Sequence, residues 1–265
     1  VTAATAPLSE ARLSDLAGRA GRAVLPLAPP LRRRVARNLA RVGAEGLEAG
    51  PLTATVGDNF ARVMAEYMRL ARLARDPRWI EVEDDASLAA ALAAGRGAVL
   101  VSAHFGNWEG VRLAVRRRGV DCALIYRAFN NPRFDALALE LIRAAGEPVL
   151  HRGRSGTRAL VRHVGRGGVA LVLIDQKQTG APRLPFFGRE AETSTAAAEM
   201  ALRFGAALIP ARARRLADGR RLSVRFEAAI PPSDPVTMTR AANDAISAWI
   251  AEDPGQWFWL HRRWR

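Results

Sequence analysis

The chain has 265 residues, of which 49% are hydrophobic and 25% are charged. This length and composition fit a globular protein with one sizeable core, and they exclude a disordered or fibrous chain. The formal net charge is +14, and Lys177 is the one lysine among 40 basic residues. A surface this basic attracts phosphates, whether these belong to nucleic acid, lipid headgroups or a substrate, as well as acidic proteins, and the charge alone does not choose among them.

The single cysteine excludes an intrachain disulfide, and Cys122 lies in the apolar run C-A-L-I-Y, which predicts a buried core residue. No uncharged stretch approaches the ~20 residues of a membrane-spanning helix, and the N-terminus lacks the pattern of a signal peptide. We therefore expect a chain that is soluble or lies on a membrane surface.

Residues 1–80 predict a helical N-terminal region. From Val56 onward, apolar residues recur every three or four positions, which indicates a helix with one buried face. Upstream, residues 19–41 hold seven arginines, no acidic residue and several interleaved apolar side chains. Two interpretations stay open for this segment: a helix pair in a membrane interface with its arginines at the headgroups, or a solvated helix pair packed on the protein.

Beyond residue 95 the pattern alternates between short β-rich runs and helical stretches. We expect strands at 98–102, 122–126, 169–174, 207–211 and 222–226, and helices near 109–118, 132–145, 155–165, 194–204 and 237–251. This alternation predicts an α/β fold with a mixed, partly parallel central sheet covered by helices. Since no linker or internal repeat separates the parts, residues 81–265 are expected to form the core of what is one structural domain.

The passage G-A-V-L-V-S-A-H-F-G-N-W-E-G, residues 97–110, carries the strongest chemical signal. An apolar strand ends just before His104, and Glu109 follows five residues later at the start of a helix. Ligands of open α/β sheets gather at the carboxyl ends of the strands. We predict that the Glu109 carboxylate orients the imidazole of His104, which then removes a proton from an attacking hydroxyl group.

Other polar residues follow the next predicted strands. Arg127 follows C-A-L-I-Y, and Asp175 and Gln176 follow V-A-L-V-L-I, so parallel strands would bring them to the same edge as His104. Arg127 could bind phosphate or steady an oxyanion, and the alternative is a structural ion pair with Asp175. The loop L-P-F-F-G-R, residues 184–189, could line an apolar slot with Arg189 meeting an anion, or it could plug the core.

Six blocks in this order resemble one family. The blocks are H-F-G-N-W-E, Y-R, D-Q, P-F-F-G-R, G-A-A-L-I-P at 205–210, and the C-terminal W-I-A-E-D-P-G-Q-W-F-W-L-H-R-R-W-R. Together they resemble the late acyltransferases of lipid A biosynthesis, the lauroyl and myristoyl transferase group, within the glycerolipid acyltransferase-like superfamily. Phosphatidylinositol mannoside acyltransferases are relatives of this group. The resemblance runs from about Leu13 to the C-terminus.

The resemblance implies catalysis by an H-x4-D/E pair, here His104 and Glu109, without a metal or cofactor. It implies O-acyl transfer from a thioester, acyl carrier protein or acyl-CoA, to a hydroxyl of a phosphorylated glycolipid such as a lipid A precursor. Arg127, Asp175, Gln176, Arg189, Asn107 and Trp108 then become substrate-binding candidates, with backbone N–H groups near Asn107 and Trp108 helping to steady negative charge. The family works at the cytoplasmic face of the inner membrane. Its members commonly begin with a hydrophobic anchor helix, whereas charges and prolines interrupt residues 8–31, so we expect peripheral or monotopic association.

The C-terminal tryptophans and arginines predict a further headgroup contact, with packing against the sheet as the alternative and the favoured one for Trp249. A mannosylated phosphatidylinositol-type glycolipid or a lysophospholipid remains a second acceptor class. A hydrolase is disfavoured because the turn around Ser155 lacks the full G-x-S-x-G pattern and Ser155 suits a helix N-cap. A zinc enzyme is disfavoured by the scattered histidines, and a nucleic-acid-binding protein by the absence of a recognisable motif.

Overall fold

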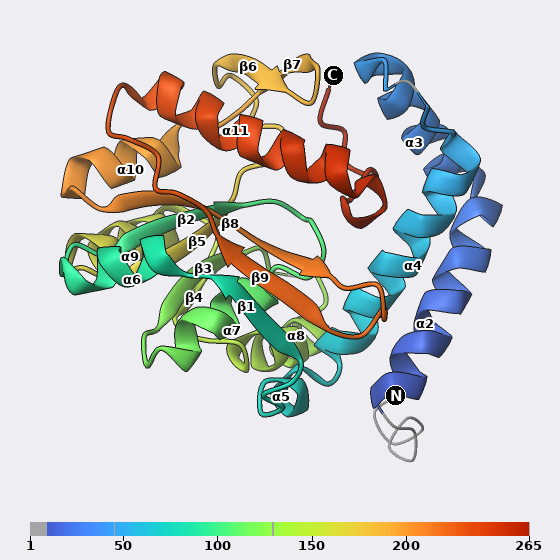
Figure 1. The fold of residues 1–265 in the computed structure, drawn as a ribbon, viewed down its shortest axis with the longest axis horizontal. Helices are drawn as coiled ribbons and strands as arrows, with labels where there is room; N and C mark the ends of the chain where they lie inside the picture. The colour runs from blue at the N-terminus through green and yellow to red at the C-terminus, as the bar shows by residue number, and fades with distance from the viewer. Residues whose placement is uncertain (1–9, 45, 129, 265) are drawn as a thin grey trace.

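The computed structural model describes residues 10–44, 46–128 and 130–264, and Figure 1 shows their arrangement. The helices are α2 (Glu10–Val24), η1 (Leu25–Leu27), α3 (Pro29–Val42), α4 (Ala49–Tyr67), α5 (Leu70–Leu73), α6 (Ala86–Ala93), α7 (Glu109–Arg117), α8 (Pro132–Arg143), α9 (Arg154–Gly165), α10 (Ala196–Phe204), α11 (Pro235–Glu252) and η2 (Pro254–Gln256). The strands are β1 (Ile80–Asp84), β2 (Ala98–Ser102), β3 (Cys122–Tyr126), β4 (Val149–His151), β5 (Val169–Leu173), β6 (Arg183–Phe186), β7 (Arg189–Glu192), β8 (Ala207–Arg215) and β9 (Leu222–Phe226).

The central sheet has seven strands in the order β1-β9-β8-β2-β5-β3-β4. Strands β8, β2, β5, β3 and β4 are parallel, whereas β9 runs antiparallel to β8 and continues the sheet to β1. Crossover helices join the parallel strands, as parallel pairing requires. The mixed α/β fold predicted from the sequence is confirmed, and β2 and β5 are direct neighbours at its centre.

Helices cover both faces of the sheet because consecutive side chains of a strand point to opposite sides. In β2, Val99 and Val101 join the hydrophobic cluster of α9, α10 and α11, while Ala98 and Leu100 join the cluster of α6, α7 and α8. All five residues of this strand are buried. A parallel strand buried on both faces explains why the run A-V-L-V-S is continuously apolar up to its last residue.

The five predicted strands and five predicted helices of the core are confirmed, each within a few residues except β8, which runs on to Arg215. Sequence analysis missed β1, β4, α6 and the small antiparallel pair of β6 and β7. It also placed Ser155 at the N-cap of α9, whereas Gly153 occupies that position and no side chain caps the helix. Gly153 has a φ of 137°, which a residue with a Cβ rarely adopts.

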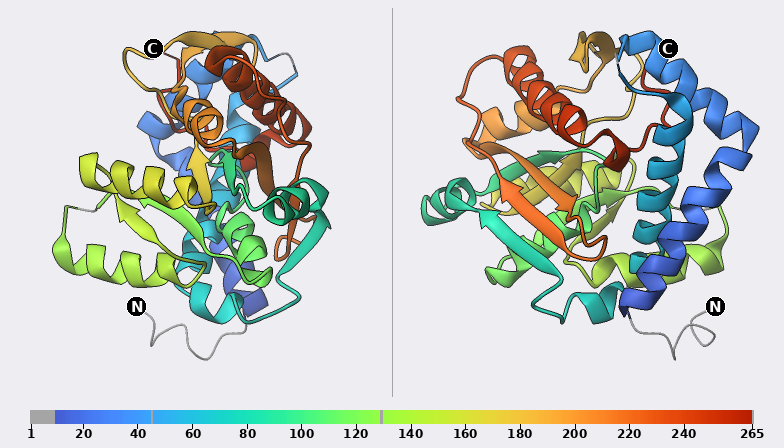
Figure 2. Two further views of the ribbon diagram at one scale, coloured as in Figure 1. Left: turned by 90° about the vertical axis from the view of Figure 1, so that its left-hand side faces the viewer. Right: turned by 45° about the vertical axis from the view of Figure 1, so that its right-hand side comes forward.

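The N-terminal helices pack along one side of the molecule, with α2 beside α4 (Figure 2). Helix α3 buries Val35 and Leu39 in the cluster that also holds Val99 of the sheet. Its Asn38 donates to the carbonyl oxygens of Trp259 (2.7 Å) and His261 (2.8 Å). The packed-helix interpretation therefore holds for α3. No helix in the described parts of the chain is long and apolar enough to cross a bilayer.

The aromatic side chains of the last turns of α11 and of the segment after it are interior structure. Trp249, Trp257, Trp259 and Trp264 are each at most 2% exposed, and Arg263 is fully buried. The packing favoured for Trp249 is confirmed, whereas the headgroup contact predicted for Trp257, Trp259, Trp264 and Arg263 is wrong. Arg262 is exposed, and Arg265 lies outside the described residues. The physical reason is that the indole rings pack against each other and against Phe186. This packing removes more apolar surface from water than a position at a lipid interface would.

Candidate active site

His104 and Asp175 meet because they follow neighbouring parallel strands. Ser102 ends β2 and pairs with Leu173, which ends β5. Each polar residue stands two positions beyond its strand, and a bond from the N–H of Ile174 to the carbonyl of Ser102 (3.0 Å) extends the pairing. Both side chains therefore emerge at the carboxyl edge of the sheet, where open α/β proteins bind their ligands.

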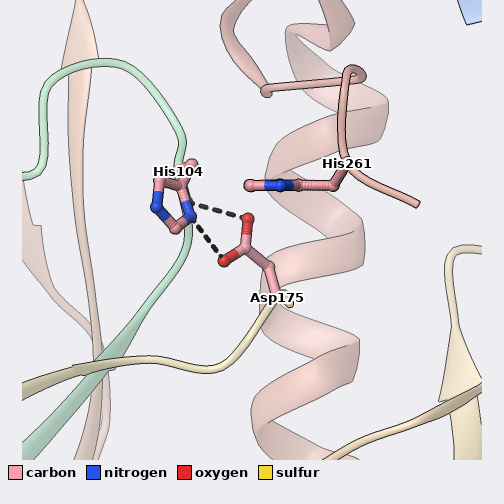
Figure 3. Close-up of side chains that lie close together, drawn as sticks. All are labelled: His104, Asp175 and His261. Atoms are coloured by element: carbon pink, nitrogen blue, oxygen red, sulfur yellow. Dashed lines mark hydrogen bonds and ion pairs between the residues drawn. The ribbon is translucent and has the colours of Figure 1, made fainter. Parts of the chain in front are cut away.

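Asp175 holds His104 through two hydrogen bonds (Figure 3). Nδ1 of His104 lies 2.9 Å from Oδ1, and the backbone N–H of His104 donates to Oδ2, also at 2.9 Å. The indole N–H of Trp257 donates a third bond to Oδ2 (2.9 Å). Burial raises the pKa of Asp175, but the charge and hydrogen bonds of His104 outweigh it and hold that pKa well below its ordinary value. Since the carboxylate is ionised, Nδ1 carries the proton and Nε2 of a neutral ring is left unprotonated.

His261 stands beside this pair. Its ring packs edge-on against that of His104, with 4.7 Å between centroids. Burial lowers the pKa of His261 to about 4, with His104 and Arg263 acting in the same direction and Asp175 opposing them. Its Nε2 is buried without a hydrogen-bond partner in the described structure. His261 is therefore neutral at physiological pH and adds no second positive charge next to His104.

Glu109 does not take the position that the sequence predicted. Its carboxylate is buried and accepts from Nη1 of Arg112 (2.6 Å) and from the hydroxyl of Tyr67 (2.8 Å). The side chain leaves the first turn of α7 toward the helix-covered interior, where Arg112 also binds the carbonyl oxygens of Ile142 (3.2 Å) and Gly146. The carboxylate that contacts the imidazole is that of Asp175, so the predicted contact between His104 and Glu109 is corrected.

Three of the other predicted site residues lie at the same edge of the sheet as His104. Gln176 is exposed, with its amide nitrogen 3.5 Å from Nε2 of His104, and the indole of Trp108 packs edge-on against His104 at 4.8 Å. Arg127 is exposed at the same edge and forms no ion pair with Asp175, so the structural alternative proposed for these two residues is wrong.

Two predicted residues are committed elsewhere. The N–H of Asn107 donates to the carbonyl of Ala213 (3.2 Å), so it is not free to steady an anion. Arg189 donates to the carbonyl of Arg41 at the end of α3 (3.1 Å), away from the site. The loop before it is a core plug, since Phe186 is 1% exposed beneath the guanidinium of Arg263, 4.5 Å from its ring centre.

A buried polar network supports the loop after β2. Oε2 of Glu66 accepts from Nδ2 of Asn107 (2.8 Å) and from Nη2 of Arg215 (2.9 Å), and Arg215 reaches Oε1 as well. Gly106 has a φ of 55°, and a Cβ there would lie 1.9 Å from the carbonyl oxygen of Ala213. The turn after His104 thus requires glycine at position 106.

A small apolar cavity adjoins His104. Its volume is about 50 Å³, and its wall includes Val56, Phe60, Trp108 and Phe258. At about 30 Å³ per liquid water molecule, that space holds one or two small groups. A larger cavity of about 540 Å³ lies elsewhere, between α2, α5 and the β8–β9 turn, and shares only Glu66 with the network described above.

The ring nitrogens of His104 and His261 and an oxygen of Asp175 lie within 4.8 Å of one another, a set of ligand types that metals use. Asp175 already accepts three N–H bonds here, two from His104 and one from Trp257. An ion would have to displace those bonds. The arrangement therefore fits an imidazole oriented by a carboxylate better than it fits an ion.

Sequence reasoning missed the contribution of the C-terminal segment. Trp257 holds Asp175, the N–H of Phe258 donates to the carbonyl of His104 (2.9 Å), and Arg263 donates to the carbonyl of Gln176 (3.0 Å). The sequence did contain a signal for burial, because the run W-F-W-L-H has too many apolar and aromatic residues for a solvated tail. The sequence did not reveal that Trp257 contacts Asp175, because about 80 residues separate them.

Comparison with known proteins identifies the family of this chain. The family model described as bacterial lipid A biosynthesis acyltransferase matches residues 1–265. A phosphatidylinositol mannoside acyltransferase of Mycolicibacterium smegmatis is 29% identical over 249 residues, covering 86% of this chain and 78% of that protein. The lipid A biosynthesis lauroyltransferase of Escherichia coli is 28% identical over 244 residues, covering 88% and 72%. The lipid A biosynthesis palmitoleoyltransferase of Escherichia coli is 28% identical over 198 residues, covering 71% and 62%. Because the family model matches the whole length of the chain, this protein belongs to the bacterial lipid A biosynthesis acyltransferase family.

Proposed function

We propose that this acyltransferase moves a fatty acyl chain from a thioester to a hydroxyl group of a phosphorylated glycolipid, with His104 as general base. The observation that carries the proposal is the contact between His104 and Asp175. It fixes the proton on Nδ1 and leaves Nε2 facing the partly open edge, where the His104 side chain is 18% exposed. Such an imidazole needs no enzyme nucleophile to activate an alcohol.

In the proposed step, Nε2 of His104 takes the proton of the acceptor hydroxyl as its oxygen attacks the thioester carbonyl. The C–O bond forms, the C–S bond breaks, and the imidazolium returns the proton to the leaving thiolate. The ionised Asp175 stabilises the imidazolium between these events. Gln176 and Trp108, which flank the ring, are proposed to contact the reacting groups.

The acyl chain is proposed to enter beside α4. The wall of the small cavity next to His104 is apolar, and the rings of Phe60 and Phe258 close it at 5.2 Å between centroids. A long chain does not fit the cavity as it stands, so binding requires these two rings to move apart. Rotation of side chains at a binding surface is common and needs no change in the fold.

The acceptor is proposed to be a lipid A precursor, with a mannosylated phosphatidylinositol-type glycolipid or a lysophospholipid as the second candidate. The two classes of relatives named above support one candidate each. In either case we propose that Arg127, which is exposed at the edge that holds His104, binds an acceptor phosphate. The donor is proposed to be acyl carrier protein, with acyl-CoA as the alternative, and the reaction is proposed to occur at the cytoplasmic face of the inner membrane.

The test is acyl transfer by the purified protein with each donor and each acceptor, followed by mass spectrometry of the lipid product. We expect His104→Ala to abolish transfer while the melting curve stays close to that of the wild type, because this side chain is partly exposed. His151→Ala is the matched control, since that histidine is exposed at the end of β4. Transfer at the wild-type rate by a folded His104→Ala protein would contradict the proposed base.

A further inference from the structure

Helix α9 displays a stripe of arginines. Arg154, Arg158 and Arg162 are spaced four residues apart, and Arg166 continues the series at the C-cap. All four are exposed. Residues four apart lie on neighbouring turns of one face, so the stripe extends ~18 Å at 1.5 Å per residue. We call these four residues the α9 arginine stripe.

Nothing in the described part of the chain compensates this charge. The helix contains no acidic residue, and none of the four guanidinium groups makes an ion pair or hydrogen bond with a described residue. Like charges four residues apart repel and disfavour the helix. Arg62 of the N-terminal region, by contrast, is bound to Asp15 and Asp58. A stripe that weakens its own helix points to a partner outside the fold.

The stripe begins at the catalytic edge. Arg152 directly follows β4, and Arg127 directly follows the neighbouring strand β3, where Tyr126 pairs with His151. Both arginines are exposed and have no ion-pair partner among the described residues. Strand β3 in turn pairs with β5, which leads to Asp175. Positive charge therefore runs from the edge that holds His104 along the outer face of α9.

The α9 arginine stripe lacks the exposed apolar side chains that a membrane-binding surface needs. Interfacial helices combine arginines with large exposed apolar side chains. The large apolar residues with the highest exposure are Leu16, Val24 and Leu27 of α2 and η1, and α9 contributes none. Figure 1 places α9 on the left of the sheet and α2 on the right, so these two surfaces lie on different sides of the molecule.

We infer that the α9 arginine stripe is the docking surface for an acidic, helical protein partner, which presents carboxylates at matching spacing. Resting on the proposed function, this partner is the acidic carrier protein that delivers the acyl thioester. With the carrier along α9, its prosthetic arm passes over the ends of β4 and β3 toward His104. Complementary charge of this kind gives rapid, salt-sensitive encounter and correct orientation.

The test compares two double variants of equal charge. Arg158→Glu with Arg162→Glu changes the stripe. Arg96→Glu with Arg240→Glu changes two exposed arginines, one in the turn before β2 and one on α11, that also lack a described partner. Binding of holo acyl carrier protein is measured by titration at several salt concentrations. The KM is measured for acyl carrier protein and for acyl-pantetheine, a donor without the protein part.

We expect the stripe variant to bind holo carrier protein roughly tenfold more weakly or worse, with a similar rise in KM for the acylated carrier and none for acyl-pantetheine. The control variant should match the wild type in both assays. Unchanged carrier binding by the stripe variant overturns the inference. So does a loss of binding to phosphatidylglycerol vesicles in place of the carrier, because the surface would then face a membrane.

The binding assay separates this inference from the proposed function. Stripe-dependent carrier binding without acyl transfer from any donor to any acceptor would retain the docking surface and reject the proposed reaction. Transfer from the acylated carrier by the stripe variant with the wild-type KM would retain the reaction and reject the docking surface.

Discussion

Two buried carboxylates lie near His104, the proposed general base, and their partners give them different roles. Glu109 is neutralised by Arg112, a guanidinium that is itself fully buried. Asp175 has no such cation and instead accepts N–H bonds from His104 and Trp257. A carboxylate tied to arginine stabilises the fold, whereas one tied to a histidine at an open edge adjusts the chemistry of that histidine. The role of each carboxylate is therefore set by the groups that donate hydrogen bonds to it.

Substitution of each carboxylate by its amide distinguishes the two roles. Asp175→Asn can no longer hold the proton on Nδ1 of His104, and we expect kcat to fall about 10²- to 10⁴-fold with the fold retained. Glu109→Gln leaves the charge of Arg112 buried without a counterion, and we expect a loss of about 3–5 kcal/mol in the free energy of unfolding. The measurements are kcat and urea denaturation for both variants. A stable Glu109→Gln protein with the larger loss in kcat would show that the assignment is reversed.

His261 makes stability depend on pH. Its pKa is about 4 in the folded protein against 6.5 in an unfolded chain, so the unfolded state binds its proton first as the pH falls. Stability is therefore unaffected above about pH 6.5 and declines between that pH and about 4. The contribution is up to about 3 kcal/mol, reduced by whatever solvent reaches the ring.

We accordingly expect His261→Gln to lose less free energy of unfolding than the wild type between pH 7 and pH 4, whatever its stability at pH 7. Chemical denaturation across this range measures the slope. His151→Gln, a change at an exposed histidine, should keep the wild-type slope. Equal slopes for all three proteins would mean that His261 titrates normally in the folded state.

At the scale of elements, the packing of α2 on α4 depends on two glycines. A Cβ at Gly57 would lie 2.3 Å from the carbonyl oxygen of Gly21 and 2.8 Å from Cβ of Leu25. A Cβ at Gly21 would in turn meet the carbonyl oxygen of Gly57 at 2.1 Å. The two helices therefore approach backbone to backbone, which no larger residue allows, and this contact places α2 along the outside of the molecule.

Alanine at position 57 should force these helices apart and cost about 1–3 kcal/mol in the free energy of unfolding, since the clash is with backbone. Gly50 provides the control within the same helix. It is exposed with open space around it, so Gly50→Ala should be neutral or stabilise by up to about 1 kcal/mol through helix propensity. Urea denaturation of both variants measures the difference. Equal stability of the two would disprove close packing of α2 on α4.

The strands differ in how well the sequence predicts them. The strands of the sheet centre were predictable because each is a short run of buried, apolar residues between helical stretches, as A-V-L-V-S and V-A-L-V-L are. Strand β1 was not, because its exposed middle residues, Glu81 to Glu83, give no apolar run. The three residues of β4 are too few to show a period.

The sequence predicted that His104 and Asp175 belong to the site, but it did not predict that they contact each other. His104 and Asp175 were identified by their positions after strands, which is a local property. Their contact depends on β5 lying next to β2, although β3 and β4 come between them in the chain. Strand order is a long-range property, and a five-residue spacing within one segment favoured Glu109 instead. His261 and Trp257 were seen in sequence as surface residues because their burial depends on packing beneath α3 and beside Phe186.

For the whole molecule, the separation of surfaces suggests how the enzyme meets its lipid acceptor. Leu16, Val24 and Leu27 are 53%, 62% and 77% exposed on α2 and η1. Exposed arginines of α2 and α3 surround them, among them Arg19 and Arg22. Apolar side chains that enter the interface, flanked by guanidinium groups at the phosphates, are the features of a helix lying on a membrane. The packing of α3 on the C-terminal segment then connects this surface to the residues that hold Asp175.

We therefore expect the protein to bind vesicles containing phosphatidylglycerol through α2 and η1, and added salt to weaken this binding because screening shortens the reach of the arginine charges. Val24→Glu with Leu27→Glu should reduce binding roughly tenfold or more, since burial of two such side chains contributes about 1.5–3 kcal/mol each. Val236→Glu, at an exposed position on α11, is the control and should bind as the wild type does. Co-sedimentation with vesicles measures all three proteins. If neither salt nor the double substitution weakens binding, the membrane contact lies on a surface other than α2 and η1.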